Sequence, residues 1–171
     1  MQKRLDIWLT IGIIPLLILT RFLPHPDNFS PFAAAFLFAG AYLGNKWYAY
    51  ALPLTILFFT DMFLGLYPSI GFTYIAYVLT VVTGHFIKNK SSIAQVGIGA
   101  LTASLIFYVV SNFGVWAIDG LYTRNLSGLV NCYVMALPFL KNTLLGNLVY
   151  SGILFSTFEL AKRNIPALQR A

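Results

Sequence analysis

A few polar side chains interrupt long apolar stretches of this sequence, and their chemistry is that of a binding site. Asp61 lies within ILFFTDMFLGL, and Lys141 and Asn142 lie within a later apolar stretch. Placing a charge in a membrane costs about 2.5 to 3.5 kcal/mol on insertion scales, so charged residues there usually face an interior or a cavity. Asp61 is therefore predicted to contact a ligand in a cavity, with two alternatives: hydration near the membrane interface, or hydrogen bonds that join helices.

Asp61 and Lys141 are expected at similar depths in the outer half of the membrane, because each lies several residues inside its apolar stretch. An ion pair between them would remove two isolated charges from lipid at once. Such a pair could be structural or could contact a substrate, and the sequence favours neither alternative.

Further polar and aromatic residues are predicted on the same side. Asn112 and Trp116 are four residues apart, which places an amide and an indole on one helix face. The loop PHPDN, which carries His25 and Asn28, offers polar groups just before another apolar stretch. These features predict an outward-facing vestibule rich in aromatic side chains. Its predicted lining is His25, Asn28, Asp61, Tyr67, Tyr74, Asn112, Trp116, Arg124, Lys141 and Asn142.

Enzyme motifs are missing from the sequence. It has no G-x-S-x-G, no H-E-x-x-H, no P-loop and no close pair of carboxylates. With one cysteine, Cys132, it predicts no intrachain disulfide and no cysteine-based zinc site. An enzyme that used Asp61 and Lys141 as acid and base would lack both a nucleophile and a metal. We therefore expect a binding protein without a catalytic site, a metal site or a resident cofactor.

The composition is that of a membrane protein. Hydrophobic residues make up 58% of the 171 residues and charged residues only 9%, against about 25% charged in a soluble domain. The mean hydropathy is +0.76. The apolar stretch at 7–19 is followed by no A-x-A-like cleavage site, so we interpret it as a retained membrane span. An all-α, polytopic membrane protein is predicted.

About 20 apolar residues are needed to cross the hydrocarbon core. On that basis residues 1–171 form a single domain with six predicted transmembrane helices, at about 5–22, 31–46, 48–66, 70–87, 93–117 and 133–160. The second, about 24 Å long, crosses upright or incompletely. The sixth is too long for one straight crossing and contains Pro138, so we expect a kink or a preceding interfacial turn.

The basic residues predict the orientation. With the N-terminus inside, the cytoplasmic side carries Lys3, Arg4, Lys46, Lys88, Lys90, Lys162, Arg163 and Arg170, and the outer loops carry Arg21 and Arg124. This bias predicts that both termini are cytoplasmic. The net charge of +6 is thus explained by topology, with anionic lipid and not nucleic acid as its natural partner.

Small residues follow the PHPDN loop at helical spacing. Ala35 and Ala39 are four residues apart, and Gly40 and Gly44 repeat that spacing on an adjoining face. Small side chains let another backbone approach closely in lipid. We predict these four residues as a partner-binding face, with packing inside the chain as the alternative.

The residues from 21 to 65 also carry a resemblance. They read R-x-L-P-H-P-x-N-F-x-P-x-A-A at 21–34, F-A-G-A at 38–41, T-D at 60–61 and L-G at 64–65. This order resembles a family of bacterial six-span membrane proteins, which are similar to the substrate-binding S components of energy-coupling-factor transporters, nearest to the cobalamin type. The remaining spans agree in number, length and topology. The resemblance implies an S-component-like bundle in the bacterial inner membrane.

The same resemblance implies a function and some residue roles. An S component captures a vitamin or another micronutrient from outside and passes it to a transmembrane coupling subunit driven by ATPases. Ala35 and Ala39 match the face that meets the coupling subunit, and His25, Asp61 and Tyr74 match positions around a corrin ring.

The match to the cobalamin type has one departure. The cysteine that ligates cobalt there would fall near Tyr74, whereas this chain has none before Cys132. His25 could supply an imidazole ligand to a cobalamin-like molecule instead. The alternative function is that of a structural or assembly subunit in a larger membrane complex.

Overall fold

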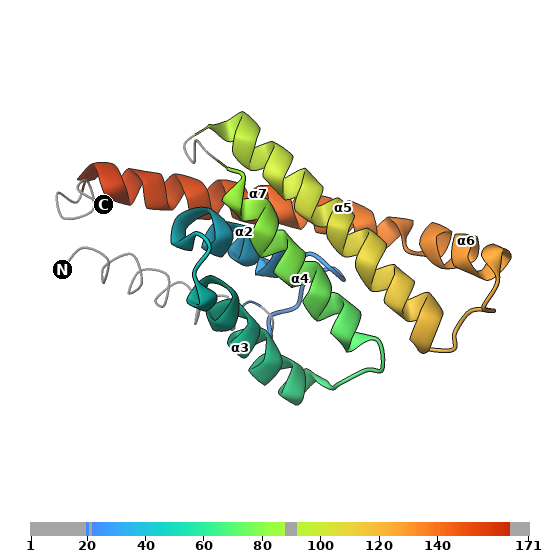
Figure 1. Cartoon of the computed structure of the whole chain (residues 1–171). Coiled ribbons are helices and arrows are strands. Elements are labelled where there is room, and N and C mark those ends of the chain that lie inside the picture. The colour runs from blue at the N-terminus through green and yellow to red at the C-terminus, as the bar shows by residue number, and fades with distance from the viewer. Residues whose placement is uncertain (1–19, 21, 88–91, 165–171) are drawn as a thin grey trace.

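The computed structural model describes residues 20, 22–87 and 92–164, and this part of the chain is all-α, as predicted. Its helices are α2 (Phe32–Leu43), α3 (Trp47–Leu64), α4 (Ile70–His85), α5 (Ile93–Ile118), α6 (Leu126–Met135) and α7 (Leu137–Asn164). Figure 1 shows the longer helices around the short α2, with α6 beyond the start of α7. Most of the predicted first span, 5–22, and both termini lie outside the described residues.

The predicted segments at 31–46, 48–66, 70–87 and 93–117 correspond to α2, α3, α4 and α5, with ends that differ by a few residues. Two of these helices end at glycines with positive φ. Gly44 has φ 65° and donates its N–H to the carbonyl of Gly40, and Gly65 has φ 109° and donates to the carbonyl of Asp61. Glycine adopts such backbone angles without the steric penalty of a Cβ, which fixes where each helix stops.

The predicted segment 133–160 is corrected by the structure. It consists of two helices, α6 and α7, which are separated at Ala136. The backbone N–H of Ala136 donates to the carbonyls of Cys132 and Tyr133, and so closes α6. Pro138 lies in the first turn of α7, where the missing proline N–H has no helical partner to lose. The proline therefore helps to start a helix and does not kink one.

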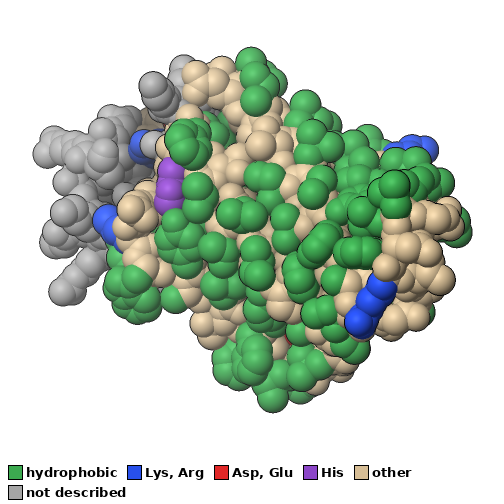
Figure 2. All heavy atoms as spheres, turned by 45° about the vertical axis from the view of Figure 1, so that its right-hand side comes forward, with side chains coloured by type: hydrophobic (Ala, Val, Ile, Leu, Met, Phe, Trp, Pro, Cys, Tyr) green, Lys and Arg blue, Asp and Glu red, His purple; other side chains and the backbone are tan. Residues whose placement is uncertain are grey.

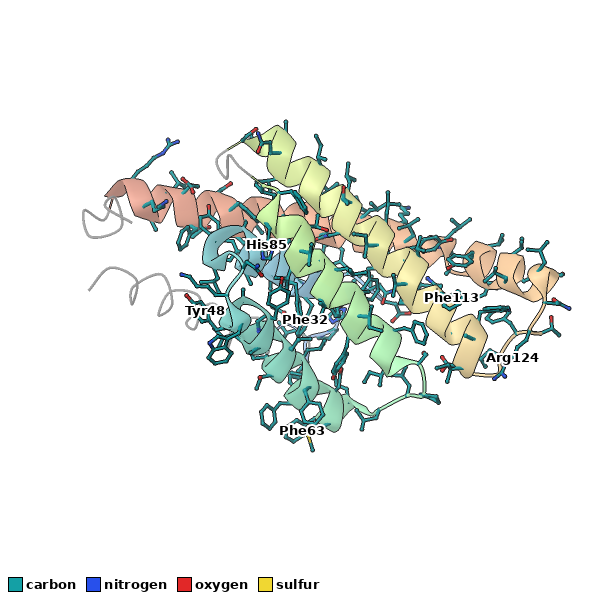
Figure 3. All side chains as sticks on the ribbon, viewed as in Figure 1. Phe32, Tyr48, Phe63, His85, Phe113 and Arg124 are labelled. Carbon is teal, nitrogen blue, oxygen red and sulfur yellow. The ribbon has the colours of Figure 1, made fainter. Side chains whose placement is uncertain are left out.

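Three of the described helices, α3, α5 and α7, are long and apolar enough to cross a membrane, whereas α2, α4 and α6 are shorter. The outward surface agrees with this composition. The face in Figure 2 is covered mainly by hydrophobic side chains, with only a few from Lys or Arg. Phe63 points away from the end of α3 and is 79% exposed (Figure 3). These observations support a membrane protein.

Helix α2 is the centre of the fold. Its sequence, FAAAFLFAGAYL, is apolar or small on every side, and nearly all of it is buried. It contacts α3, α4, α5 and α7. A helix that is hydrophobic all round is expected to be enclosed by other elements or by lipid. Here it is enclosed by its own chain.

Two clusters of side chains hold α2 from opposite sides. On one side Phe36 stacks on Tyr77 of α4, with ring centroids 4.5 Å apart and an interplanar angle of 16°. On the other side Phe38 meets the edges of Phe155 and Phe158 of α7, at 5.3 and 5.2 Å. Such ring pairs stabilise packing beyond the area that they bury. The aromatic content thus joins α2 to both of its main neighbours.

The small residues of α2 mostly pack against α4 and not against another subunit. A Cβ at Gly40 would collide with the backbone carbonyl of Val81, and a Cβ at Gly84 would collide with that of Leu37. Ala39 is buried, and Ala35 is partly buried. At Ala39 and Gly40 these contacts favour the alternative of packing inside the chain, because the space beside them is occupied by the chain itself. Gly44, which is partly exposed, ends the helix.

The bundle has two ends with different residues. The loop end, where α3 and α5 stop and α4 and α7 begin, carries the connections 22–31, 65–69 and 119–125. The basic end, where α3 and α5 begin and α7 stops, carries Lys46, Lys162 and Arg163. The basic end lies to the left in Figure 1 and the loop end to the lower right.

Candidate functional site

A pocket of about 170 Å³ opens at the loop end among α4, α5 and α7. A hollow of about 20 Å³ shares Asn28, Phe107 and Thr143 with it and reaches Ala33 and Tyr77. We call the larger space the loop-end pocket. Its lining consists of Asn28, Tyr67, Ser69, Thr73, Phe107, Tyr108, Ser111, Asn112, Val115, Phe139, Leu140 and Thr143.

The rim of the loop-end pocket is fixed by the carboxylate of Asp119, at the end of α5. Ser69 donates its backbone N–H to one oxygen of Asp119 at 2.9 Å and its hydroxyl to the other at 2.8 Å. Ser69 is only 2% exposed. Hydrogen bonds to a charged acceptor are stronger than those between neutral groups. The pair therefore joins the start of α4 to the end of α5 and sets the width of the pocket.

Two further hydrogen bonds hold the loops that border the pocket. Tyr67 donates to the hydroxyl of Thr73 at 2.7 Å, which folds the connection 65–69 back on α4. The amide of Asn142 donates to the backbone carbonyl of Asp27 at 3.0 Å, which fastens the connection 22–31 to α7. Asn28, with φ 61°, then presents its side chain to the pocket.

The hydroxyl groups of α5 and α7 bond within their own helices. Ser111 donates to the carbonyl of Phe107 at 2.6 Å, and Thr143 donates to that of Phe139 at 2.8 Å. Such bonds to the preceding turn satisfy the hydroxyl proton without help from another helix. Both residues line the pocket.

The structure brings only part of the predicted vestibule together. Asn28, Tyr67 and Asn112 line the loop-end pocket, and Asn142 holds its border. None of the described Asp, Glu, Lys, Arg or His residues lines it. The pocket is thus polar but carries no formal charge on its walls.

Asp61 belongs to a different environment. It is 2% exposed on α3 and accepts a hydrogen bond from the hydroxyl of Tyr74 at 2.8 Å. Lys141 is exposed on α7, and α3 and α7 do not touch within the described residues. The suggested ion pair between Asp61 and Lys141 therefore does not form there. Asp61 instead joins α3 to α4, which was the structural alternative.

The other predicted lining residues lie outside the pocket wall. His25 is exposed, with Nδ1 3.0 Å from the carbonyl of Pro26. Trp116 donates to the carbonyl of Thr123 at 3.0 Å, and Arg124 lies in the same connection, beyond α5 (Figure 3). The predicted vestibule is thus divided between the pocket and the loops around it.

Apart from Tyr67, sequence reasoning missed the hydroxyl residues of the pocket. Tyr108, Ser111 and Asn112 have the spacing i, i+3, i+4, which places three polar groups on one face of α5. That spacing was the available signal. It is easily overlooked because serine and threonine are common in apolar helices, where they bond to their own backbone.

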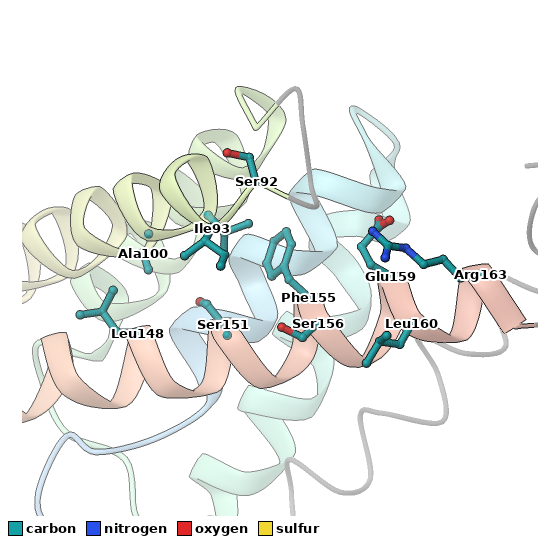
Figure 4. A pocket seen from close by; sticks show the side chains of 13 residues that line it. Ser92, Ile93, Ala100, Leu148, Ser151, Phe155, Ser156, Glu159, Leu160 and Arg163 are labelled. Carbon is teal, nitrogen blue, oxygen red and sulfur yellow. The ribbon is translucent and has the colours of Figure 1, made fainter.

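A second hollow lies at the basic end, between α5 and α7 (Figure 4). This basic-end groove has a volume of about 360 Å³. Its walls are mainly apolar, and Glu159 and Arg163, one turn apart on α7, lie at its end. Glu159 also accepts a hydrogen bond from Tyr42 of α2 at 2.6 Å. The lining is Ser92, Ile93, Val96, Gly97, Ala100, Leu148, Ser151, Gly152, Phe155, Ser156, Glu159, Leu160 and Arg163.

A buried polar cluster lies between the two hollows. Asn147 of α7, 1% exposed, donates to the carbonyl of Ala100 at 2.8 Å and to the hydroxyl of Ser104 at 3.1 Å. Ser151 donates to the side-chain oxygen of Asn147 at 3.4 Å. Hydrogen bonds between helices are a common means of association in membranes. The cluster joins α5 to α7 midway between pocket and groove.

These features define a protein whose described part is all-α, with three helices of membrane-spanning length and an uncharged polar pocket at one end of the bundle. The chain belongs to a family of unknown function, DUF6580, whose model matches residues 1–168. No curated protein and no solved structure matches the chain. Within the described residues, no group of three or more His, Cys, Asp or Glu could hold a metal ion.

Proposed function

We propose that this protein is the substrate-capture subunit of a micronutrient importer and that it binds its ligand in the loop-end pocket. The observation that carries the proposal is the pocket itself, which combines hydroxyl and amide groups with aromatic walls. Ligand sites in proteins are usually concave and apolar, with a few placed polar groups. The loop end is also where three connections meet, and connections commonly carry binding residues.

The proposed orientation has six membrane spans, both termini in the cytoplasm and the loop end outside. Lys46, Lys162 and Arg163 at the basic end support it, because basic residues accumulate on the cytoplasmic side. A bacterial inner membrane is part of the proposal through the resemblance in residues 21–65. Passage of the ligand to a coupling subunit and ATPases rests on that resemblance alone.

The size of the pocket favours a small vitamin-like ligand over a cobalamin-like one. Its volume of about 170 Å³ lies below the roughly 300 to 1,000 Å³ of drug-sized ligand sites, and a corrin ring needs more space. The imidazole of His25 lies on the exposed loop and not in the pocket wall, so it supplies no cobalt ligand there. We therefore propose a micronutrient other than a corrinoid as the ligand.

A structural or assembly subunit is the second candidate, and the outer half of α3 favours it. Phe58, Met62 and Phe63 are exposed there, and α3 contacts only α2 and α4 among the described helices. Large exposed apolar faces meet either lipid or another protein. An assembly subunit would use this face and would carry no ligand in the loop-end pocket.

Native mass spectrometry separates the two candidates. The protein is released gently from its own membranes, beside the variants Ser111→Leu, in the pocket, and Ser156→Leu, in the groove. A capture subunit retains a small organic molecule in the wild type and in Ser156→Leu, and loses about tenfold or more of it in Ser111→Leu, because leucine fills the pocket. A wild-type protein without ligand, bound stoichiometrically to other membrane chains, would establish the assembly subunit instead.

A further inference from the structure

We propose that the loop-end pocket selects ligands that donate hydrogen bonds and that it rejects anions. Its ligand is a small uncharged or cationic molecule, with N–H or O–H groups on an apolar ring. This inference rests on the proposed function, because it names the ligand class of the same pocket.

The first observation concerns the acceptors to which the hydroxyl groups of the pocket donate their protons. Ser111 donates its proton to the carbonyl of Phe107, and Thr143 donates its proton to that of Phe139. A hydroxyl has one proton and two lone pairs. Once the proton is committed to a backbone carbonyl, the oxygen can only accept a further hydrogen bond. These two side chains are therefore acceptors toward a ligand.

The same holds at two other positions in the lining. Tyr108 donates its phenolic proton to the carbonyl of Tyr133 at 2.6 Å, and Ser69 donates its hydroxyl proton to the carboxylate of Asp119 at 2.8 Å. Neither acceptor has a proton to give in return, so the direction of each bond is fixed. Four hydroxyl residues of the lining thus have their protons committed to other groups, so that their oxygens can only accept further hydrogen bonds.

The amide of Asn112 adds another acceptor. One N–H of its side chain donates to the carbonyl of Tyr108 at 2.7 Å, while no described residue donates to its side-chain oxygen. The donors that remain are its second N–H, the amide of Asn28 and the hydroxyl of Thr73. Acceptors therefore outnumber donors on the pocket wall.

The charged groups near the pocket also disfavour an anionic ligand. The carboxylate of Asp119 bonds directly to Ser69 of the lining, whereas Lys141 and Arg124 are absent from it. An anion would lose its hydration and gain no basic partner, which is costly in a partly enclosed site. A donor-rich neutral molecule loses less hydration free energy, and a cation regains part of its loss from the lone pairs of the wall and from the nearby carboxylate.

The apolar side chains of the lining indicate the apolar part of the ligand. Phe107, Val115, Phe139 and Leu140 supply aromatic and aliphatic surface. A volume of about 170 Å³ accommodates one substituted ring. Benzamidine, benzamide and benzoate are therefore suitable probes, because they share a ring and a planar head group but are cationic, neutral and anionic at pH 7.

The test measures the binding of these three probes to the purified full chain in nanodiscs by isothermal titration calorimetry. We expect benzamidine to bind at least about tenfold more tightly than benzoate, with benzamide between them, since one hydrogen bond to a charged group accounts for a tenfold change. Ser111→Ala and Thr143→Val, which remove acceptor oxygens, should each weaken benzamidine by about fivefold. Ser156→Ala, in the groove, should leave its binding unchanged.

Asn112→Asp provides a variant of similar size that adds a negative charge and loses the hydrogen bond to the carbonyl of Tyr108. It should bind benzamidine more tightly and benzoate more weakly than the wild type. If benzoate binds as tightly as benzamidine and its binding depends on Ser111, the proposed selectivity for hydrogen-bond donors is overturned, but the pocket remains a binding site. If substitutions at Ser111, Asn112 and Thr143 leave probe binding unchanged, both the proposed selectivity and the proposed binding site are overturned.

Discussion

The loop-end pocket and the basic-end groove share two helices in their walls, α5 and α7, and differ in what they offer a ligand. The pocket, at about 170 Å³, is lined by hydroxyl and amide groups without formal charge. The groove, at about 360 Å³, has mainly apolar walls and two charged residues, Glu159 and Arg163. The larger hollow thus has the more apolar walls. The volume of a hollow does not by itself identify a binding site. The direction of the hydrogen bonds in the pocket wall, in contrast, restricts the chemical class of the ligand.

The buried cluster around Asn147 joins the two helices that both hollows share, and breaking it should have the largest effect. Asn147→Leu removes hydrogen bonds to the carbonyl of Ala100 and the hydroxyl of Ser104. We expect the free energy of unfolding to fall by about 2 kcal/mol, because two buried bonds are lost and their partners stay buried. Unfolding in detergent with increasing denaturant measures this change.

Ser151→Ala is the matched control for this prediction. It removes only the long bond of 3.4 Å to the side-chain oxygen of Asn147, so its effect should stay within a few tenths of a kcal/mol. An equal loss of stability in both variants would show that the cluster fills space and that its hydrogen bonds contribute little.

The second prediction concerns the rim of the pocket. Asp119→Asn removes the charge that accepts two hydrogen bonds from Ser69. We expect a loss of about 1.5 kcal/mol in the free energy of unfolding and weaker binding of benzamidine, because a cation loses the nearby carboxylate. Calorimetry with benzamidine and benzoate measures the second effect. Weaker binding of both probes to the same degree would mean that Asp119 shapes the pocket and does not set its charge preference.

The third and smallest prediction concerns the groove. Tyr42→Phe removes the hydrogen bond of 2.6 Å to Glu159 and keeps the ring that packs against Phe158. We expect a loss of about 1 kcal/mol in stability and no change in benzamidine affinity, because the groove lies at the opposite end of the bundle. A clear change in affinity would show that the two ends are coupled through α7.

The sequence predicted the positions of α3, α4 and α5 closely, because each is an apolar stretch with breaks at glycine or polar residues. It did not predict that α2 lies at the centre. In membrane proteins the residues that face lipid and those that face other helices are similarly apolar. The small residues of α2 therefore suggested a partner face, although Gly40 packs on Val81 of the same chain.

The candidate site was predicted in part for a related reason. A sequence gives the depth of a residue along its helix, but not the direction in which the helix presents it. Asp61 and Lys141 have similar predicted depths, yet they lie on α3 and α7, which do not touch in the described part of the chain. Asn112 lines the pocket, as do its neighbours Tyr108 and Ser111 on the same face of α5. The direction of the hydroxyl protons required coordinates.

The shortness of α2 has a consequence for how the chain is made. Its 12 residues extend about 18 Å, well short of the roughly 30 Å of hydrocarbon. In a membrane the backbone at its ends would meet lipid unless other helices covered it. Helix α2 therefore gains a stable place only when α4 and α7, which follow it in the sequence, have been synthesised. The connection 22–31, and with it Asn28 of the pocket, reaches its final position late in assembly.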